Sequence, residues 1–144
     1  MKSCLLTLLT FLSVSTAAAL GTLPNGKYSG KMTCTSSKQS FQCDSFMTVE
    51  DTTLLTVSSC PGSDPQSNLK TFVIDSAGFF TFTTDIGEKG SGYVTAHGIH
   101  TDAVFNGIPG EDTFFFMNNS LYLISSATVP GEKFKCEGVF KGVS

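Results

Sequence analysis

Four cysteines that follow an apolar leader constrain this chain more than any other feature of its sequence. Residues 1–19 carry Lys2, then the apolar run Leu5–Leu12, and end in three alanines, which is the pattern of a cleavable secretory signal peptide. Export to an oxidising compartment favours disulfides, so we expect a secreted, extracellular protein with a single domain over residues 20–144. The four cysteines expected to pair are Cys34, Cys43, Cys60 and Cys136.

The rest of the chain has the residue types of β-strands separated by tight turns. Phe, Thr, Val and Tyr are frequent, and Gly, Asn and Asp interrupt them at short intervals, without a sustained helical period. We predict an all-β fold of about 8–10 short strands, either an antiparallel barrel or a two-sheet sandwich, because both hide strand edges. The predicted strands are 27–35, 41–50, 53–59, 69–75, 79–84, 92–97, 101–106, 113–117, 121–126 and 133–141.

Turn signals separate these strands. Pro109–Gly110 and Pro130–Gly131 are expected to break the chain. The acidic pairs Glu50–Asp51 and Glu111–Asp112 are expected in turns, where carboxylates are solvated. Asn118 begins an Asn-Asn-Ser glycosylation sequon at an expected hairpin tip.

The cysteine positions favour one of three possible disulfide pairings. Cys43 and Cys60 are equidistant from a turn at Asp51–Thr52, so a hairpin there places them opposite each other. Cys34 would then pair with Cys136 and join the first strand to the last, as a closed barrel requires. The rival pairs Cys34 with Cys43 across a turn at 38–39 and leaves Cys60 for Cys136.

Two segments are apolar on both faces of their strands. Residues 114–116 are three phenylalanines, and residues 121–124 alternate two leucines with Tyr122 and Ile124. Such a strand is either covered on both faces or exposes an apolar patch. Coverage by loops is the more frequent outcome, and the patch would be a ligand or partner surface.

The sequence contains no convincing catalytic or metal constellation. His97 and His100 are the only histidines, and positions three apart in a strand face opposite sides, so we expect no metal site even with Asp102 nearby. Cysteines held in disulfides are unavailable for catalysis, and no nucleophile or phosphate-loop motif occurs. We therefore expect no catalytic residues, no cofactor and no enzyme activity.

Composition narrows the choice of partner. The chain has no arginine and no lysine cluster, which argues against nucleic acid, and its one apolar run is too short for a membrane span. The absence of Trp disfavours a carbohydrate platform. A barrel lined by aromatic residues could instead enclose a small apolar ligand. The candidate lining residues are Phe80, Phe82, Tyr93, Phe105, Phe114 and Phe116.

Three short motifs carry a family resemblance. They are Cys60–Gly62, the stretch Phe72–Ser76 with Gly78–Phe80, and Phe134–Val139. Together they resemble the secreted fungal β-barrel family typified by the major mould allergen. The resemblance implies a small disulfide-bonded barrel, often a homodimer, that is linked to interaction with a plant host.

The leading hypothesis is a non-enzymatic secreted β-barrel that acts by binding an extracellular protein, of the effector or host-interaction kind. One alternative is a lipocalin-like carrier of a small apolar ligand. Another is a secreted hydrolase or a protease inhibitor that presents the loop Cys60–Ser67. Oligomeric state stays open, with a homodimer as one alternative.

Overall fold

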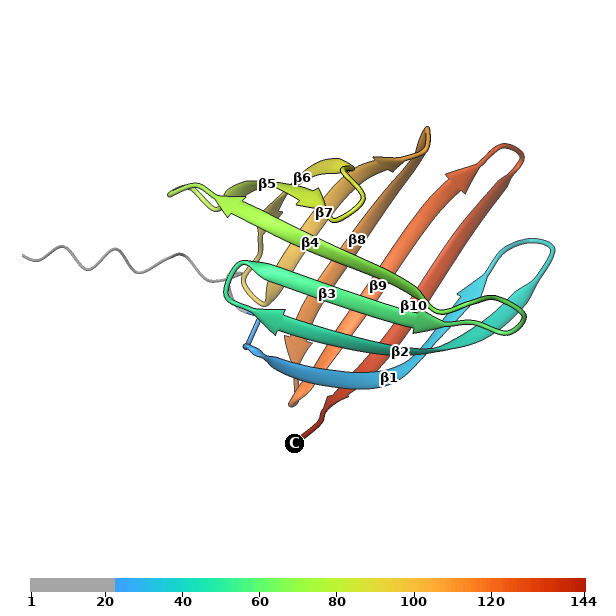
Figure 1. The fold of residues 1–144 in the computed structure, drawn as a ribbon, viewed down its shortest axis with the longest axis horizontal. Helices are drawn as coiled ribbons and strands as arrows, with labels where there is room; N and C mark the ends of the chain where they lie inside the picture. The colour runs from blue at the N-terminus through green and yellow to red at the C-terminus, as the bar shows by residue number, and fades with distance from the viewer. Residues whose placement is uncertain (1–22) are drawn as a thin grey trace, which may run out of the picture.

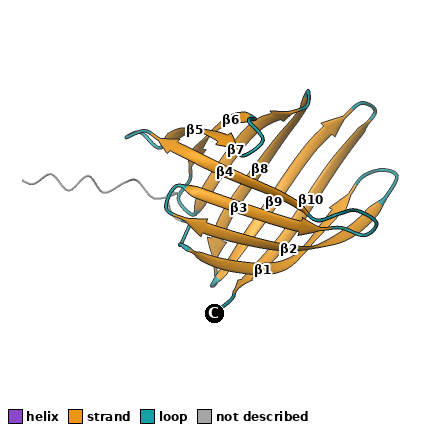
Figure 2. Ribbon diagram, viewed as in Figure 1, coloured by secondary structure: helices purple, strands orange, loops and turns teal. Residues whose placement is uncertain are grey.

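The computed structural model describes residues 23–144, so the predicted signal peptide lies outside the described residues. The described chain folds into ten strands (Figure 2). Within it, no helix is long and apolar enough to cross a membrane. The strands are β1 (Gly26–Thr35), β2 (Ser40–Glu50), β3 (Thr53–Ser59), β4 (Gln66–Ile74), β5 (Phe79–Thr84), β6 (Lys89–Val94), β7 (Gly98–Phe105), β8 (Ile108–Met117), β9 (Ser120–Val129) and β10 (Glu132–Gly142).

The strands form a closed antiparallel barrel in which each strand pairs with its neighbours in sequence and β1 pairs with β10. In Figure 1 the strands β1–β4 form the front wall, and β7–β10 run obliquely behind them. Closure leaves no free strand edge. The prediction of an all-β barrel is confirmed, and the sandwich alternative is wrong.

Both disulfides follow the pairing that the sequence favoured. Cys34 lies directly opposite Cys136 in the β1–β10 ladder, with Cα atoms 4.0 Å apart. The β2–β3 hairpin turns at Asp51–Thr52 and brings Cys43 to Cys60, with Cα atoms 4.2 Å apart. The rival pairing is wrong because the β1–β2 register sets Cys34 opposite Phe41. We call the end of the barrel that holds both bonds the disulfide end, and the opposite end the N-terminal end.

The predicted strands 92–97, 101–106 and 113–117 needed correction. The β7–β8 hairpin turns at Asn106–Gly107, where both residues have positive φ (49° and 78°). An Asn-Gly pair is the preferred sequence for a two-residue hairpin turn. Pro109 and Gly110 therefore lie inside β8 rather than at a chain break, and β6 and β7 begin three residues earlier than expected.

The N-terminal half of the barrel interior is filled by large apolar side chains. Phe72 packs edge-on against Phe80 with ring centroids 5.1 Å apart. Tyr28 donates its hydroxyl proton to the carbonyl of Pro24 at 2.9 Å, and burial raises the pKa of this phenol. The buried core comprises Leu23, Tyr28, Met47, Val49, Leu54, Phe72, Phe80, Phe82, Ile99, Phe114, Leu121, Leu123 and Phe140.

Glycines on β6 make room for these phenylalanines. A Cβ added at Gly92 would collide with the backbone carbonyl oxygen of His100 on β7 and would stand 2.7 Å from the ring of Phe80, closer than packed atoms tolerate. We expect Gly92→Ala to lower the free energy of unfolding by about 1–3 kcal/mol through overpacking.

The control for this prediction is Gly142→Ala, because a Cβ at Gly142 meets nothing within 4 Å. We expect its free energy of unfolding to stay within about 1 kcal/mol of the parent protein. Urea denaturation of both variants measures the difference. A Gly92→Ala protein as stable as the parent would contradict the close approach of Phe80 and of the His100 backbone to Gly92.

Candidate binding surface

An apolar surface lies on the outside of the barrel, over β8, β9 and β10. Alternation along the strands sends Phe114 and Leu123 into the core and turns Phe115 and Tyr122 outward. Phe115 and Tyr122 are direct cross-strand partners whose rings stack in parallel, with centroids 4.9 Å apart and an interplanar angle of 5°. The two-faced strands recognised in the sequence thus have one face in the core and the other on the surface.

These rings form the floor of an open groove of about 620 Å³. Ile124 on β9 and Val139 on β10 extend the apolar floor, and their side chains remain 41% and 45% exposed. Within residues 23–144, neither a loop nor a second layer buries them. The structure therefore favours the exposed patch over coverage by loops. We call this surface the outer groove.

Charged residues flank the outer groove. Lys31 on β1 and Glu137 on β10 both line it. Each also forms an ion pair with another residue. Nζ of Lys31 lies 3.3 Å from Oδ1 of Asp44, and Oε1 of Glu137 lies 2.5 Å from Nζ of Lys135. Both pairs are largely exposed, so they contribute little to stability. An apolar centre with a charged rim is the composition of a protein–protein interface.

Five of the six residues proposed to line a ligand cavity lie on inward strand faces, and the sixth, Tyr93, does not. Phe80, Phe82 and Phe114 are buried in the core at 2–3% exposure. Phe116 is partly buried against the same core, and Phe105 is partly exposed on β7.

Tyr93 is misplaced in that set. On β6, Gly90 and Gly92 face the barrel interior beside the rings of Phe82 and Phe80. Alternation along the strand therefore turns Tyr93 outward. It is 44% exposed, and its ring lies 5.1 Å from that of His100.

The interior also contains an ion pair that the sequence analysis missed. Lys70 on β4 places its Nζ 2.6 Å from Oδ2 of Asp112 on β8. The Lys70 ammonium also lies 5.5 Å and 5.6 Å from the ring centroids of Phe82 and Phe114. The expectation of a turn at Glu111–Asp112 is wrong, because both residues lie within β8. Alternation with buried Phe114 identifies Asp112 as the inward member of the pair.

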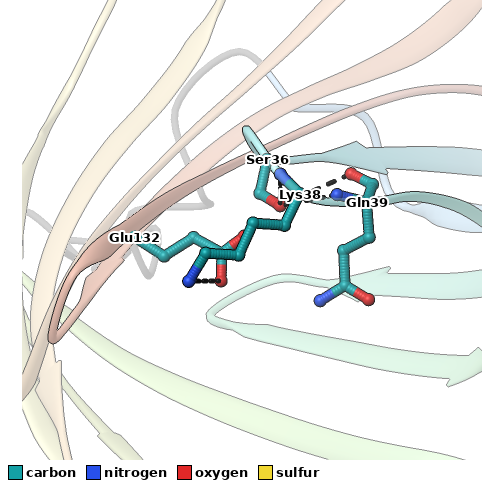
Figure 3. A network of polar contacts seen from close by, with 4 residues as sticks. All are labelled: Ser36, Lys38, Gln39 and Glu132. Carbon is teal, nitrogen blue, oxygen red and sulfur yellow. Dashed lines mark hydrogen bonds and ion pairs between the residues drawn. The ribbon is translucent and has the colours of Figure 1, made fainter.

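Carboxylates also occur near the disulfide end. Figure 3 shows Lys38, in the β1–β2 turn, reaching Glu132 at the start of β10; their charged atoms are 4.0 Å apart. The hydroxyl of Ser36 accepts hydrogen bonds from the backbone amides of Lys38 and Gln39, each 3.2 Å long, and these bonds order the turn. One carboxylate oxygen of Glu132 and one of Glu88 are buried without a hydrogen-bond partner.

The remaining candidate residues lie at separate places on the surface. His97 is exposed in the β6–β7 turn, whereas His100 lies on β7, so the two imidazoles do not form one site. Asn118 is exposed in the β8–β9 turn with a φ of 51°, as expected for a hairpin tip. The inhibitor-loop candidate is an exposed β3–β4 connection over residues 61–65, and its last two residues begin β4.

Comparisons with known proteins give no relative. No protein-family model, curated protein or solved structure matches this chain. The geometry of the described residues therefore carries the functional argument.

Proposed function

We propose that this chain is a secreted, non-enzymatic β-barrel that binds an extracellular protein through the outer groove, as an effector or host-interaction protein does. The outer groove carries this proposal, because a half-buried stacked aromatic pair forms its floor beside the exposed side chains of Ile124 and Val139. The resemblance to the mould allergen family is in keeping with it.

Because core side chains occupy the interior, we favour a binding site on the outside of the barrel over the carrier alternative. The buried phenylalanines of β4, β5 and β8 belong to one packed core. Phe82 and Phe80 also occupy the space in front of Gly90 and Gly92. A carrier of an apolar ligand needs an apolar cavity, and here the rings that would line it pack against one another.

The chemistry of the outer groove suits a protein partner. Tyr and Phe are enriched in interface hot spots because they bury a large area at low entropic cost. The rim adds a positive charge at Lys31 and a negative charge at Glu137, and such charges would orient a partner.

Photo-crosslinking from the groove tests the proposal. A benzophenone analogue of phenylalanine replaces Tyr122 in the full exported chain, which is irradiated in the extracellular medium into which it is secreted. We expect an adduct with an extracellular protein, because position 122 lies in the floor of the groove. Adding Val139→Lys should abolish the adduct, because a charge placed in the apolar floor opposes burial.

The matched control carries the same analogue at Phe79 on β5. This aromatic side chain is 61% exposed and does not line the groove. Non-specific binding would therefore label it at least as strongly as position 122. An adduct from position 122 alone supports the proposal. Equal labelling from both positions, or no adduct from either, would contradict it.

A further inference from the structure

We propose that His100, Asp102 and Glu111 form a zinc-binding site on the outer face of β7 and β8. Histidine supplies an imidazole nitrogen, and each acidic residue supplies a carboxylate oxygen. These three ligand atoms all lie within 4.8 Å of one another. The inference is independent of the outer groove and of any partner bound there.

The hairpin register brings the three residues together. His100 and Asp102 are two residues apart on β7, so they share its outer face. Asp102 lies directly opposite Glu111 on β8, because the β7–β8 hairpin turns at Asn106–Gly107. All three side chains therefore project from the same side of a rigid two-stranded unit.

The donor separations fit a small divalent ion. Nε2 of His100 lies 3.4 Å from Oδ2 of Asp102, which is long for a hydrogen bond. Two ligand atoms that each stand about 2.1 Å from a tetrahedral zinc ion are about 3.4 Å apart. The carboxylate oxygen of Glu111 lies within 4.8 Å of both other ligand atoms, so a small adjustment brings it to the same ion, and water would complete the coordination.

Hydroxyl groups of neighbouring residues form hydrogen bonds with two of the three ligands. Nδ1 of His100 lies 2.9 Å from the hydroxyl oxygen of Thr113 on β8. In the tautomer that donates from Nδ1 to Thr113, the Nε2 lone pair is free for a metal. The hydroxyl of Ser126 on β9 donates to Oε1 of Glu111 at 2.8 Å. This arrangement resembles the outer shell by which metalloproteins fix a histidine ligand.

The donor set selects the class of metal. A site made only of carboxylates would favour calcium or magnesium, whereas an imidazole favours zinc and its transition-metal neighbours. Lys133 and Lys135 line the same small hollow as His100 and Glu111. Their positive charge opposes a cation, so we expect Lys133→Gln to tighten zinc binding.

Calorimetric titration with zinc chloride tests the site on the secreted, disulfide-bonded chain, prepared without a histidine tag. We expect one zinc ion per chain, and His100→Gln should weaken the affinity at least tenfold, a loss of about 1.4 kcal/mol of binding free energy. Glu111→Gln should weaken it as well. Thr113→Val, which removes the partner of Nδ1, should weaken it by roughly 10–100-fold.

His97→Gln is the matched control, because His97 is the only other histidine and lies in the exposed β6–β7 turn. We expect this variant to bind zinc like the parent protein. Thermal unfolding without metal shows that each variant is folded, and the zinc-induced shift of the His100 imidazole NMR signals reports ligation directly. Equal weakening by His97→Gln, unchanged affinity in His100→Gln, no zinc binding, or calcium binding as tight as zinc would each overturn the proposal.

Discussion

The double substitution Cys34→Ser/Cys136→Ser should lower the free energy of unfolding by about 4.7 kcal/mol, the value for a closed loop of about 100 residues in the chain-entropy model. The disulfide spans 102 positions and joins β1 to β10, the strand pair that closes the barrel. Losing it frees the two ends of the unfolded chain. Urea denaturation under non-reducing conditions measures this difference.

The second disulfide supplies the matched control. Cys43 and Cys60 are separated by 17 positions within one hairpin, so Cys43→Ser/Cys60→Ser should cost roughly 3 kcal/mol. We expect the long-range bond to contribute more than the short one. The opposite order would contradict the dependence on loop length that the chain-entropy model assigns to the two disulfides.

Substituting Asp112→Asn is expected to lower the free energy of unfolding by about 3 kcal/mol, the lower end of the range for breaking a buried ion pair. The side chain of Lys70 is only 7% exposed, and Asp112 is its ion-pair partner at 2.6 Å. The variant keeps the shape of the side chain but leaves the ammonium without a counter-charge among the rings of Phe82 and Phe114. Chemical denaturation at neutral pH tests this expectation.

Two further variants test whether the loss of stability comes from leaving a buried charge unpaired or from losing an ion pair as such. Lys70→Met/Asp112→Leu should be within about 1 kcal/mol of the parent or more stable, because it removes both buried charges together. Asp44→Asn, which breaks the exposed pair with Lys31, should cost less than about 1 kcal/mol. A double variant as unstable as Asp112→Asn would contradict the interpretation.

Much of the barrel could be predicted from local sequence signals. Cys43 and Cys60 are equidistant from Asp51–Thr52, and this symmetry predicted both the β2–β3 register and the disulfides that the structure contains. The boundaries expected around β7–β8 are wrong because the turn lies at Asn106–Gly107 and not at Pro109–Gly110. A proline can occupy a strand position that needs no backbone donor, whereas an Asn-Gly pair directly favours a two-residue hairpin turn.

The candidate sites were harder to derive because they depend on cross-strand register. Alternation in Leu121–Ile124 identified an outward apolar face, but only pairing across β8 and β9 stacks Tyr122 on Phe115. Glu111 meets Asp102 only when the hairpin turns at the correct residues. The Lys70–Asp112 pair crosses the barrel interior between β4 and β8. A local sequence pattern does not predict a contact between strands that are not neighbours.

The core phenylalanines fill the N-terminal half of the barrel interior, and we place the binding surface on the outside of the barrel. Native mass spectrometry of the disulfide-bonded chain, after removal of any glycan at Asn118, is the decisive measurement. We predict the mass of the polypeptide with two disulfides and no retained apolar small molecule, because the core phenylalanines occupy the interior. A stoichiometric lipid-like mass that survives purification and disappears in Phe114→Ala would contradict the account and identify the protein as a carrier.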